Sequence, residues 1–453
     1  MTRRCGVVVV MLVVVLAGCD WTAYLYSPGH TSAADDGGFS TGNVGAAVQR
    51  WRWTPDPPPP GATNEIYASP VTWKGRVFIG VNSGDFYALS LDTGQVLWKR
   101  SFGFQPALTC AAAGIAATAA VRDDGNGNPL VYVNAPDGYV YELDGLTGAT
   151  VWRNVVAIPS TTVNDAYAWS SVTLASNRVY VGMTSNCDNP FIRGGVKAFD
   201  PVTGQLMATY YSEPAGSVGA GVWTTPAADG SSVFATTGSA NDANPPPGDQ
   251  YSLVKLDPVT LARTGIFHVP DATGPDLDFG SSPVLFHATI GGTDTPLVGA
   301  CSKNGYFYAV RRDTMQLVWK RMLGVGTAYG QTACFSGGVF GGGLYVGGPQ
   351  TTIGGKTVAG SVRSLDPATG AIRWELPVVA DPLGAGALDN SGVLAYSTTD
   401  WTRTANDCYL LEASTGRVLR AIPSPGNAPA FSQPVWVDGK LLVANFDSLG
   451  AYW

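Results

Sequence analysis

Short apolar runs separated by polar turns recur along most of the chain. RVFIG at 76–80 and LVYVN at 130–134 are each followed by a second apolar run, FYALS and YVYEL. Apolar runs of this length, bounded by turns rich in glycine and aspartate, indicate β-strands. Long helical patterns are absent, while 57 glycines and 31 prolines provide residues for many turns. The sequence therefore predicts an all-β protein.

A longer phrase repeats with these strands, as LDTGQVLW at 91–98 and LDGLTGATVW at 143–152. Its turn position occurs seven times, at steps of 54, 56, 57, 54, 55 and 46 residues: Gly94, Gly148, Gly204, Leu261, Met315, Gly370 and Gly416. Glycine suits a turn with positive φ, and the preceding Asp or Thr can cap the turn amides. The following strand usually carries a tryptophan, which we expect to fill the wedge between neighbouring units: Trp98, Trp152, Trp319 and Trp374. Four-stranded repeats of roughly this length predict a β-propeller.

The number of blades follows from the length of the repeating region. From Val48 to Trp453 there are 406 residues, which is about 51 per unit for eight units and 58 for seven. The final stretch, 439–453, stops before any TG turn, whereas VQRWRWT at 48–54 is a lone strand ahead of the first repeat. We therefore expect residues 48–453 to form an eight-bladed propeller whose N-terminal strand completes the last blade. Such closure removes exposed sheet edges.

The first residues have a different character. Arg3 and Arg4 precede an apolar run at 7–16, too short to span a bilayer but typical of a signal peptide. LAGC at 16–19 resembles a bacterial lipobox, in which the cysteine is acylated. We expect residues 1–18 to be a lipoprotein signal peptide, 19–47 an anchoring segment, and lipidated Cys19 to hold an extracytoplasmic protein on the cell membrane. The alternative is an ordinary signal peptide with a chance cysteine.

The charge of the chain argues against nucleic acid as a partner, and its cysteine content bears on disulfide formation. The net charge is -7 and only 13% of residues are charged, so the chain lacks the basic surface that nucleic acids require. An exported protein can form disulfides, but five cysteines lie beyond Cys19, so at least one of them is unpaired. The sequence does not assign partners among these five: Cys110, Cys187, Cys301, Cys334 and Cys408.

The repeated A/L-x-D-x-x-TG-x-x-x-W phrase resembles the tryptophan-docking repeat of the eight-bladed propellers that bind pyrroloquinoline quinone. It covers nearly all of the chain after the leader. That fold serves quinoprotein alcohol dehydrogenases, polyvinyl-alcohol dehydrogenases among them. It also serves the non-catalytic lipoprotein of the outer-membrane β-barrel assembly machinery. The resemblance therefore implies either an alcohol-oxidising enzyme or a binding platform.

Several segments resemble the dehydrogenase branch in order and spacing. VWTTPAADG at 222–230 resembles the blade that stacks a tryptophan on the quinone, which implies this role for Trp223. SKNG at 302–305 resembles the Lys/Arg-Asn-Gly that binds the quinone oxygens, which implies Lys303. IRGGVKAFD at 192–200 resembles the segment after the metal-binding glutamate, and Arg193 in it is a further candidate for cofactor binding.

PDLDFGSSPVL at 275–285 resembles the segment carrying the catalytic aspartate, which implies catalytic or metal-binding roles for Asp276 and Asp278. A calcium or lanthanide ion is the expected metal of this branch. The family's glutamate before Arg193 is missing, however, and its asparagine after TG is Ser239 here. Calcium takes six to eight oxygen ligands, so Asp276, Asp278 and Ser239 form an incomplete set.

The chemistry of alcohol oxidation assigns these residues roles. A carboxylate must take the hydroxyl proton, and a cation must polarise the quinone carbonyl that receives the hydride. Asp276 is the better candidate for the base, and Lys303 is able to act as the cation without a metal. The alternative is that Asp276 and Asp278 cap a loop, Trp223 is blade core and Lys303 faces solvent.

Two functions therefore stay open. The first is a lipid-anchored quinoprotein that oxidises an alcohol group, including one on a large or polymeric substrate. The second is a non-catalytic propeller that binds envelope proteins or cell-envelope polymer.

Overall fold

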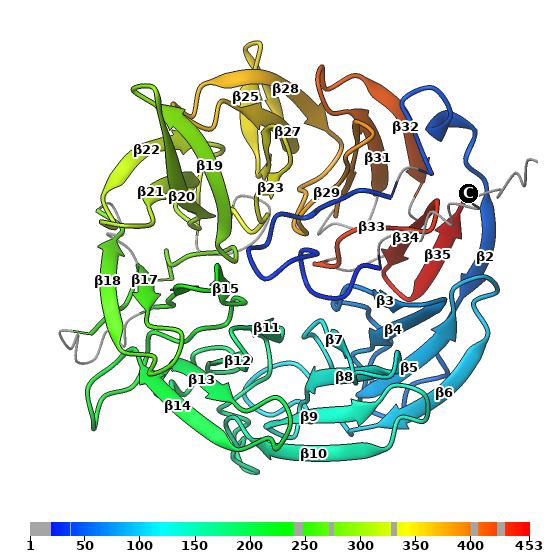
Figure 1. The fold of residues 1–453 in the computed structure, drawn as a ribbon, viewed down its shortest axis with the longest axis vertical. Helices are drawn as coiled ribbons and strands as arrows, with labels where there is room; N and C mark the ends of the chain where they lie inside the picture. The colour runs from blue at the N-terminus through cyan, green and yellow to red at the C-terminus, as the bar shows by residue number, and fades with distance from the viewer. Residues whose placement is uncertain are drawn as a thin grey trace, which may run out of the picture.

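The protein is a ring of eight four-stranded antiparallel blades (Figure 1). The computed structural model describes residues 20–36, 38–239, 248–270, 276–327, 333–399, 406–423 and 431–453. Within these ranges the helical content is a single short 3-10 turn, η1 (Val44–Ala46), so the predicted all-β class and blade number are confirmed. No helix in the described part of the chain is long and apolar enough to cross a bilayer.

In the first seven blades, the strands run in chain order from the centre of the ring outward. The first four blades are β3 (Val71–Trp73), β4 (Arg76–Gly80), β5 (Asp85–Ser90) and β6 (Val96–Ser101); β7 (Ala120–Asp123), β8 (Pro129–Asn134), β9 (Tyr139–Asp144) and β10 (Thr150–Val155); β11 (Thr173–Ala175), β12 (Arg178–Met183), β13 (Gly195–Phe199) and β14 (Leu206–Tyr211); and β15 (Ala227–Ala228), β16 (Val233–Thr236), β17 (Ser252–Leu256) and β18 (Arg263–His268).

The remaining blades follow in the same direction around the ring. They are β19 (Val284–Ile290), β20 (Thr293–Cys301), β21 (Tyr306–Arg311) and β22 (Leu317–Met322); β23 (Val339–Phe340), β24 (Leu344–Gly348), β27 (Gly360–Leu365) and β28 (Ile372–Val378), with the hairpin β25 (Thr351–Ile353) and β26 (Lys356–Val358) inserted; β29 (Ala387–Asp389), β30 (Val393–Ser397), β31 (Asp407–Glu412) and β32 (Val418–Pro423); and β33 (Val435–Val437), β34 (Lys440–Asn445), β35 (Ser448–Tyr452) and β2 (Gln49–Trp53).

The ring closes as the sequence predicts, through its N-terminal strand. β2 pairs antiparallel with β35, so that Trp51 faces Ala451 and Trp53 faces Leu449. Figure 1 shows β2, in blue, beside β35, in red, close to the C-terminus. The expected strand at 48–54 differs from the observed one by a residue at each end. Closure leaves no blade of the ring without its outer strand.

Each repeated tryptophan docks on the turn glycine of the next blade. A Cβ atom added to Gly148 would lie 2.8 Å from the Trp98 ring, and the Trp98 indole N–H donates to Gly145 O at 3.0 Å. The same pairing occurs five times in the described ring: Trp51 on Gly94, Trp98 on Gly148, Trp152 on Gly204, Trp319 on Gly370 and Trp374 on Gly416. The tryptophan thus fills the wedge between blades, as predicted.

Two turns lack the glycine, and there the facing residue is small instead. Leu261 and Met315 occupy the turn position with φ of 56° each. Ala208 and Gly265 stand in the tryptophan positions opposite Ala198 and Lys255, in register with Trp98 opposite Ala88 in the first blade. The Met315 side chain lies 2.7 Å from the position that a Cβ on Gly265 would take. The larger side chain at the turn therefore compensates for the smaller residue on the neighbouring blade, and the space between the blades stays filled.

A row of hydrogen bonds joins the starts of the inner strands of six blades, from the eighth through the first to the fifth. In each pair a backbone N–H of one blade donates to the hydroxyl of the next at 2.9–3.0 Å: Gln433 to Ser69, Ser69 to Thr118, Thr118 to Ser171, Ser171 to Thr225 and Thr225 to Ser282. Buried polar groups need such partners, so these hydroxyls fix the blades around the central channel.

The segment from Asp20 to Ala34 crosses the middle of the ring, shown in dark blue in Figure 1. Inner-strand amides of six blades donate to its carbonyls, at Thr72, Val121, Ala228, Leu285, Phe340 and Leu388. Its short strand β1 (Ala33–Ala34) pairs parallel with β29, and Trp21 is fully buried. The Asp20 carboxylate accepts from the Lys74 N–H in the turn joining β3 and β4. The segment therefore covers the end of the channel at which these first turns lie.

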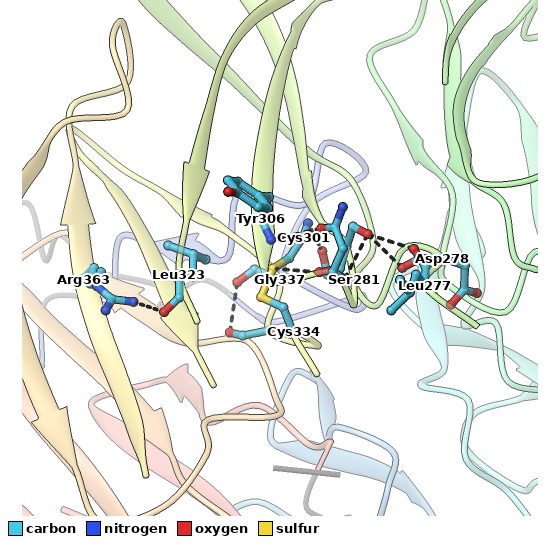
Figure 2. The surroundings of a disulfide bond; sticks show 12 residues. Leu277, Asp278, Ser281, Cys301, Tyr306, Leu323, Cys334, Gly337 and Arg363 are labelled. Atoms are coloured by element: carbon cyan, nitrogen blue, oxygen red, sulfur yellow. Dashed lines mark hydrogen bonds between the residues drawn. A yellow bond between two sulfur atoms is a disulfide. The ribbon is translucent and has the colours of Figure 1, made fainter. Parts of the chain in front are cut away.

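Four of the five cysteines form disulfides. Cys110 pairs with Cys187, and Cys301 pairs with Cys334. Cys408 is buried and free, in agreement with the expectation of at least one unpaired cysteine. Cys301 ends β20 and Cys334 precedes β23, so the second bond ties two neighbouring blades together near the channel (Figure 2).

Candidate functional site

Four of the predicted side chains meet where segments of two neighbouring blades converge. Trp223 lies in the link that precedes β15, and Asp276 and Asp278 lie in the link that precedes β19. Lys303 lies in the turn between β20 and β21. In an antiparallel four-stranded blade, these links and second turns share one face, whereas first and third turns share the other. The cluster is therefore on the face opposite the turn that binds Asp20.

Lys303 is the centre of this cluster. Its Nζ lies 2.6 Å from Asp276 Oδ1 and 2.7 Å from Asp278 Oδ1. The Trp223 indole N–H donates to Asp278 Oδ2 at 2.9 Å, and the Ser239 hydroxyl donates to Asp276 Oδ1 at 3.3 Å. The ammonium is also 5.2 Å from the Trp223 ring centroid, within range of a cation–π contact. Ser239 is thus placed beside Asp276, as a hydrogen-bond donor.

Hydrogen bonds from Ser302 and Lys303 hold the backbone around the two aspartates in place. The Lys303 N–H donates to Asp278 O at 2.8 Å, and the Ser302 hydroxyl contacts the carbonyls of Leu277 and Asp278. Figure 2 shows Ser281 between this segment and the Cys301–Cys334 disulfide; its hydroxyl accepts from the Cys301 N–H at 2.7 Å. Asp276 and Asp278 therefore lie on a loop whose backbone is held by hydrogen bonds.

Burial makes the charges of this cluster interdependent. Asp278 is 1% exposed and Lys303 8% exposed. Burial raises the pKa of Asp278 above its ordinary value, while the Lys303 ammonium opposes that rise. Burial alone would lower the pKa of Lys303, but the Asp278 and Asp276 carboxylates raise it, so the lysine stays charged. An ion pair buried to this degree breaks at a large cost when one partner is removed.

The cluster lines a cavity of about 270 Å³ at the mouth of the central channel. Its other lining residues come from the third blade and from aromatic positions four residues before inner strands: Trp169, Thr184, Ser185, Asn186, Cys187, Asp188, Phe335 and Phe431. Trp223 also borders a narrower space of about 90 Å³ that extends to Tyr24 of the N-terminal segment. The cavity is thus open on one face and backed by aromatic rings.

Asp188 is a third carboxylate that lines this cavity. It lies beside Cys187, which the disulfide to Cys110 holds in place. Burial raises the pKa of Asp188 to about 7, and the Asp278 charge adds to the effect. No spacing along the chain linked Asp188 to Asp276 and Asp278, since these residues meet only across the channel mouth.

Arg193 does not join the cluster. Its Nε donates to Glu213 O at 2.7 Å and its guanidinium lies 3.8 Å from the Tyr211 ring centroid. These contacts place Arg193 in a second pocket, of about 360 Å³, between the third and fourth blades. The buried Glu213 carboxylate lines the same pocket, and burial followed by the Asp249 charge raises its pKa to about 7. Arg193 therefore has a side-chain role away from the cavity.

The expected calcium or lanthanide site does not match the arrangement of donors. Among the residues that the structure describes, no three carboxylate, histidine or cysteine side chains gather in a group able to hold a metal ion. Asp276 and Asp278 converge on the Lys303 ammonium instead. A metal would have to displace that lysine.

Comparison with known proteins agrees with the repeat and the fold. Residues 49–245 match the family model described as Outer membrane protein assembly factor BamB. The chain is 25% identical to a polyvinylalcohol dehydrogenase of Sphingopyxis sp. (strain 113P3), over 66% of this chain and 51% of that protein. A polyvinylalcohol dehydrogenase of Pseudomonas sp. is also 25% identical, with 68% and 52% covered. The chain spans about half the length of these curated relatives.

Solved structures of both functional kinds share the fold. Quinohemoprotein alcohol dehydrogenase from Comamonas testosteroni superposes with a TM-score of 0.74 at 16% identity, covering 96% of this chain and 80% of that one. BamB from Moraxella catarrhalis superposes with a TM-score of 0.56 at 13% identity, covering 90% and 97%. At these identities the likeness establishes the architecture alone.

Proposed function

Because this chain is a member of the pyrroloquinoline-quinone-like eight-bladed propeller family, we propose that it is a quinone-dependent dehydrogenase that oxidises an alcohol. The observation that carries the proposal is the buried cluster of Lys303, Asp276, Asp278 and Trp223 at the channel mouth. Buried charges are costly to maintain, and such clusters in cavities are typical of functional sites. Lys99 of the first blade also lies between two carboxylates, those of Asp56 and Asp85, but its side chain is 36% exposed, against 10% for Lys303.

The two aspartates differ in access to the cavity, which assigns them different roles. The Asp276 side chain is 38% exposed, whereas that of Asp278 is 2% exposed. Asp276 is therefore able to contact a substrate hydroxyl and take its proton. Asp278 holds Lys303 with one oxygen and the Trp223 indole with the other, so it positions both.

Pyrroloquinoline quinone, when bound, supplies the carbonyl carbon that accepts hydride. The residues that suit it are the Trp223 ring as a stacking surface and the Lys303 ammonium as a donor to its oxygens. In the same cavity the Ser185 hydroxyl accepts from the Ile192 N–H and donates to the Asp188 carboxylate, which keeps that carboxylate in place. Aromatic faces and a few convergent polar groups are the usual composition of a cofactor pocket.

Turnover tests this proposal directly. Purified protein supplied with the quinone, an alcohol and an artificial electron acceptor should reduce the acceptor. Asp276→Asn should lower kcat by about 10²–10⁴-fold while the protein stays folded, since it removes the base. Asp313→Asn, in an exposed turn of the fifth blade, is the matched control and should keep full activity. Equal activity in both variants would exclude Asp276 as the base.

A binding platform is the second candidate. The family model for the assembly factor BamB matches residues 49–245, and the cavity carries three aspartates against one lysine. This excess of negative charge is unfavourable for a quinone that bears carboxylates. If no alcohol supports turnover and the quinone does not bind, the propeller acts through its faces on envelope proteins or polymers.

Membrane attachment is part of the same proposal. Cys19 and the leader at 1–18 lie outside the described residues, but the adjacent Asp20 is bound at the turn between β3 and β4. A lipid on Cys19 would therefore attach to the face opposite the cavity, whose mouth would point away from the membrane. Cys19→Ala should release a folded protein into the soluble fraction. Retention of that variant on carbonate-washed membranes would place the anchor elsewhere.

A further inference from the structure

We infer that the Lys303 ammonium is the resident cation of this site and replaces the metal ion expected of the quinoprotein dehydrogenases. This inference deepens the proposed function and rests on it for its catalytic meaning. It concerns the donor atoms of the cluster, which can be tested without any turnover.

The carboxylate oxygens that face the interior of the cluster already have partners. One oxygen of each aspartate lies 2.6–2.7 Å from Lys303 Nζ. The second oxygen of Asp278 accepts from the Trp223 indole, and the Ser239 hydroxyl reaches the same Asp276 oxygen as the lysine. A calcium ion needs six to eight oxygens at 2.3–2.6 Å, which these side chains cannot provide while Lys303 stays between them.

The position of the ammonium supports the same conclusion. Lys303 lies between Asp276 and Asp278 and neutralises one of the two carboxylates, while Asp188 lines the same cavity. Lys303 reaches the cluster from the turn between β20 and β21, and its backbone N–H is hydrogen-bonded to Asp278 O. The lysine is therefore held at both its backbone and its ammonium. Its position is built into the loop geometry.

Replacement of the lysine should convert the cluster into a metal site. Lys303→Gln leaves two converging carboxylates without a cation, and a divalent or trivalent ion can then restore the balance of charge. Lys303→Gln should melt at a lower temperature than the wild type in EDTA, and calcium or lanthanum should raise its melting temperature. The wild type should melt at the same temperature with and without these ions.

Terbium provides a second readout, because its emission is excited through a nearby tryptophan. We expect sensitised terbium emission from Lys303→Gln and a decrease when Trp223→Phe is added, because Trp169 lines the same cavity, with no emission from the wild type. Terbium emission or a calcium-dependent melting temperature in the wild type, abolished by Asp278→Asn, would overturn the inference.

The inference can be tested even if Lys303→Gln does not fold, and separately from the proposed function. If Lys303→Gln does not fold, metal titration of the wild type by calorimetry still decides the question, since binding that Asp278→Asn removes contradicts the inference. Failure of the wild type to bind the quinone would argue against the proposed function while leaving the cation measurement intact. The two ideas therefore fail separately.

Discussion

The docking of tryptophan on the turn glycine predicts a large and local effect of Gly148→Ala. The new Cβ would lie 2.8 Å from Trp98 Cε3 and 3.0 Å from Cζ3, closer than carbon atoms approach without displacement. Gly148 has a φ of 75°, which disfavours alanine by about 1–2 kcal/mol on its own. Displacement of a packed ring adds about 1–3 kcal/mol. We therefore expect a loss of about 2–5 kcal/mol in the free energy of unfolding.

Gly230 offers a control that separates the two contributions. Its φ is 84°, and a Cβ built on it meets no atom within 4 Å. Gly230→Ala should therefore cost only the backbone term, about 1–2 kcal/mol. Urea unfolding of both variants, followed by tryptophan fluorescence, measures the difference. Equal losses for Gly148→Ala and Gly230→Ala would refute the idea that tight docking of Trp98 stabilises the junction between blades.

Two other predictions concern closure and pH. Deletion of Gln49–Trp53 should lower the melting temperature and increase light scattering, because β35 would lose its hydrogen-bonded neighbour. An unchanged melting temperature would contradict closure of the ring by β2. The raised pKa of buried Glu213, about 7 against an ordinary 4.5, means that the folded protein binds this proton more tightly than the unfolded chain. Stability from this group is therefore complete below pH 4.5 and declines by roughly 1–3 kcal/mol as pH rises through 7. Glu213→Gln should flatten that decline in unfolding measured from pH 5 to 8, and an identical slope in both proteins would reject the assignment.

The architecture was predictable because its determinants repeat. A tryptophan in an outer strand and a glycine in the next turn are one structural unit, so their spacing reveals both the blade number and the lone strand that completes the ring. Leu261 and Met315 were recognisable as turn positions only through that spacing. Only the structure shows that Leu261 and Met315 face the small residues Ala208 and Gly265, because these two pairs share no residue type that the sequence could reveal.

Features that depend on contacts across the ring were beyond sequence reasoning. Nothing in the N-terminal segment from Asp20 to Ala34 repeats, yet it bonds the inner strands of six blades. The disulfide between Cys110 and Cys187 joins a link between blades to a loop 77 residues later. Such pairings depend on the closed ring, which brings distant segments together.

The candidate site was predictable in part. Family order placed Trp223, Asp276, Asp278 and Lys303 in neighbouring blades, but it left open whether the lysine faces solvent. The structure turns Lys303 inward because two carboxylates and an aromatic ring offset the loss of hydration. Arg193 lies in a similar position along its blade, yet Tyr211 and the Glu213 carbonyl draw it into another pocket. The motif therefore predicts the position of the residue in its blade, whereas the surrounding residues determine where its side chain points.

Quinone binding is the most direct test of the central claim that this cluster is a cofactor site. Calorimetric titration of the wild type with pyrroloquinoline quinone should show one site per chain, with quenching of tryptophan fluorescence. Lys303→Gln should weaken binding about 10- to 150-fold, the loss of one charge-assisted hydrogen bond of about 1.5–3 kcal/mol. Lys99→Gln, an exposed lysine on the outer strand β6, should bind as the wild type does. Absence of heat and quenching at high micromolar quinone, with or without calcium, would contradict the claim and leave the binding platform as the function.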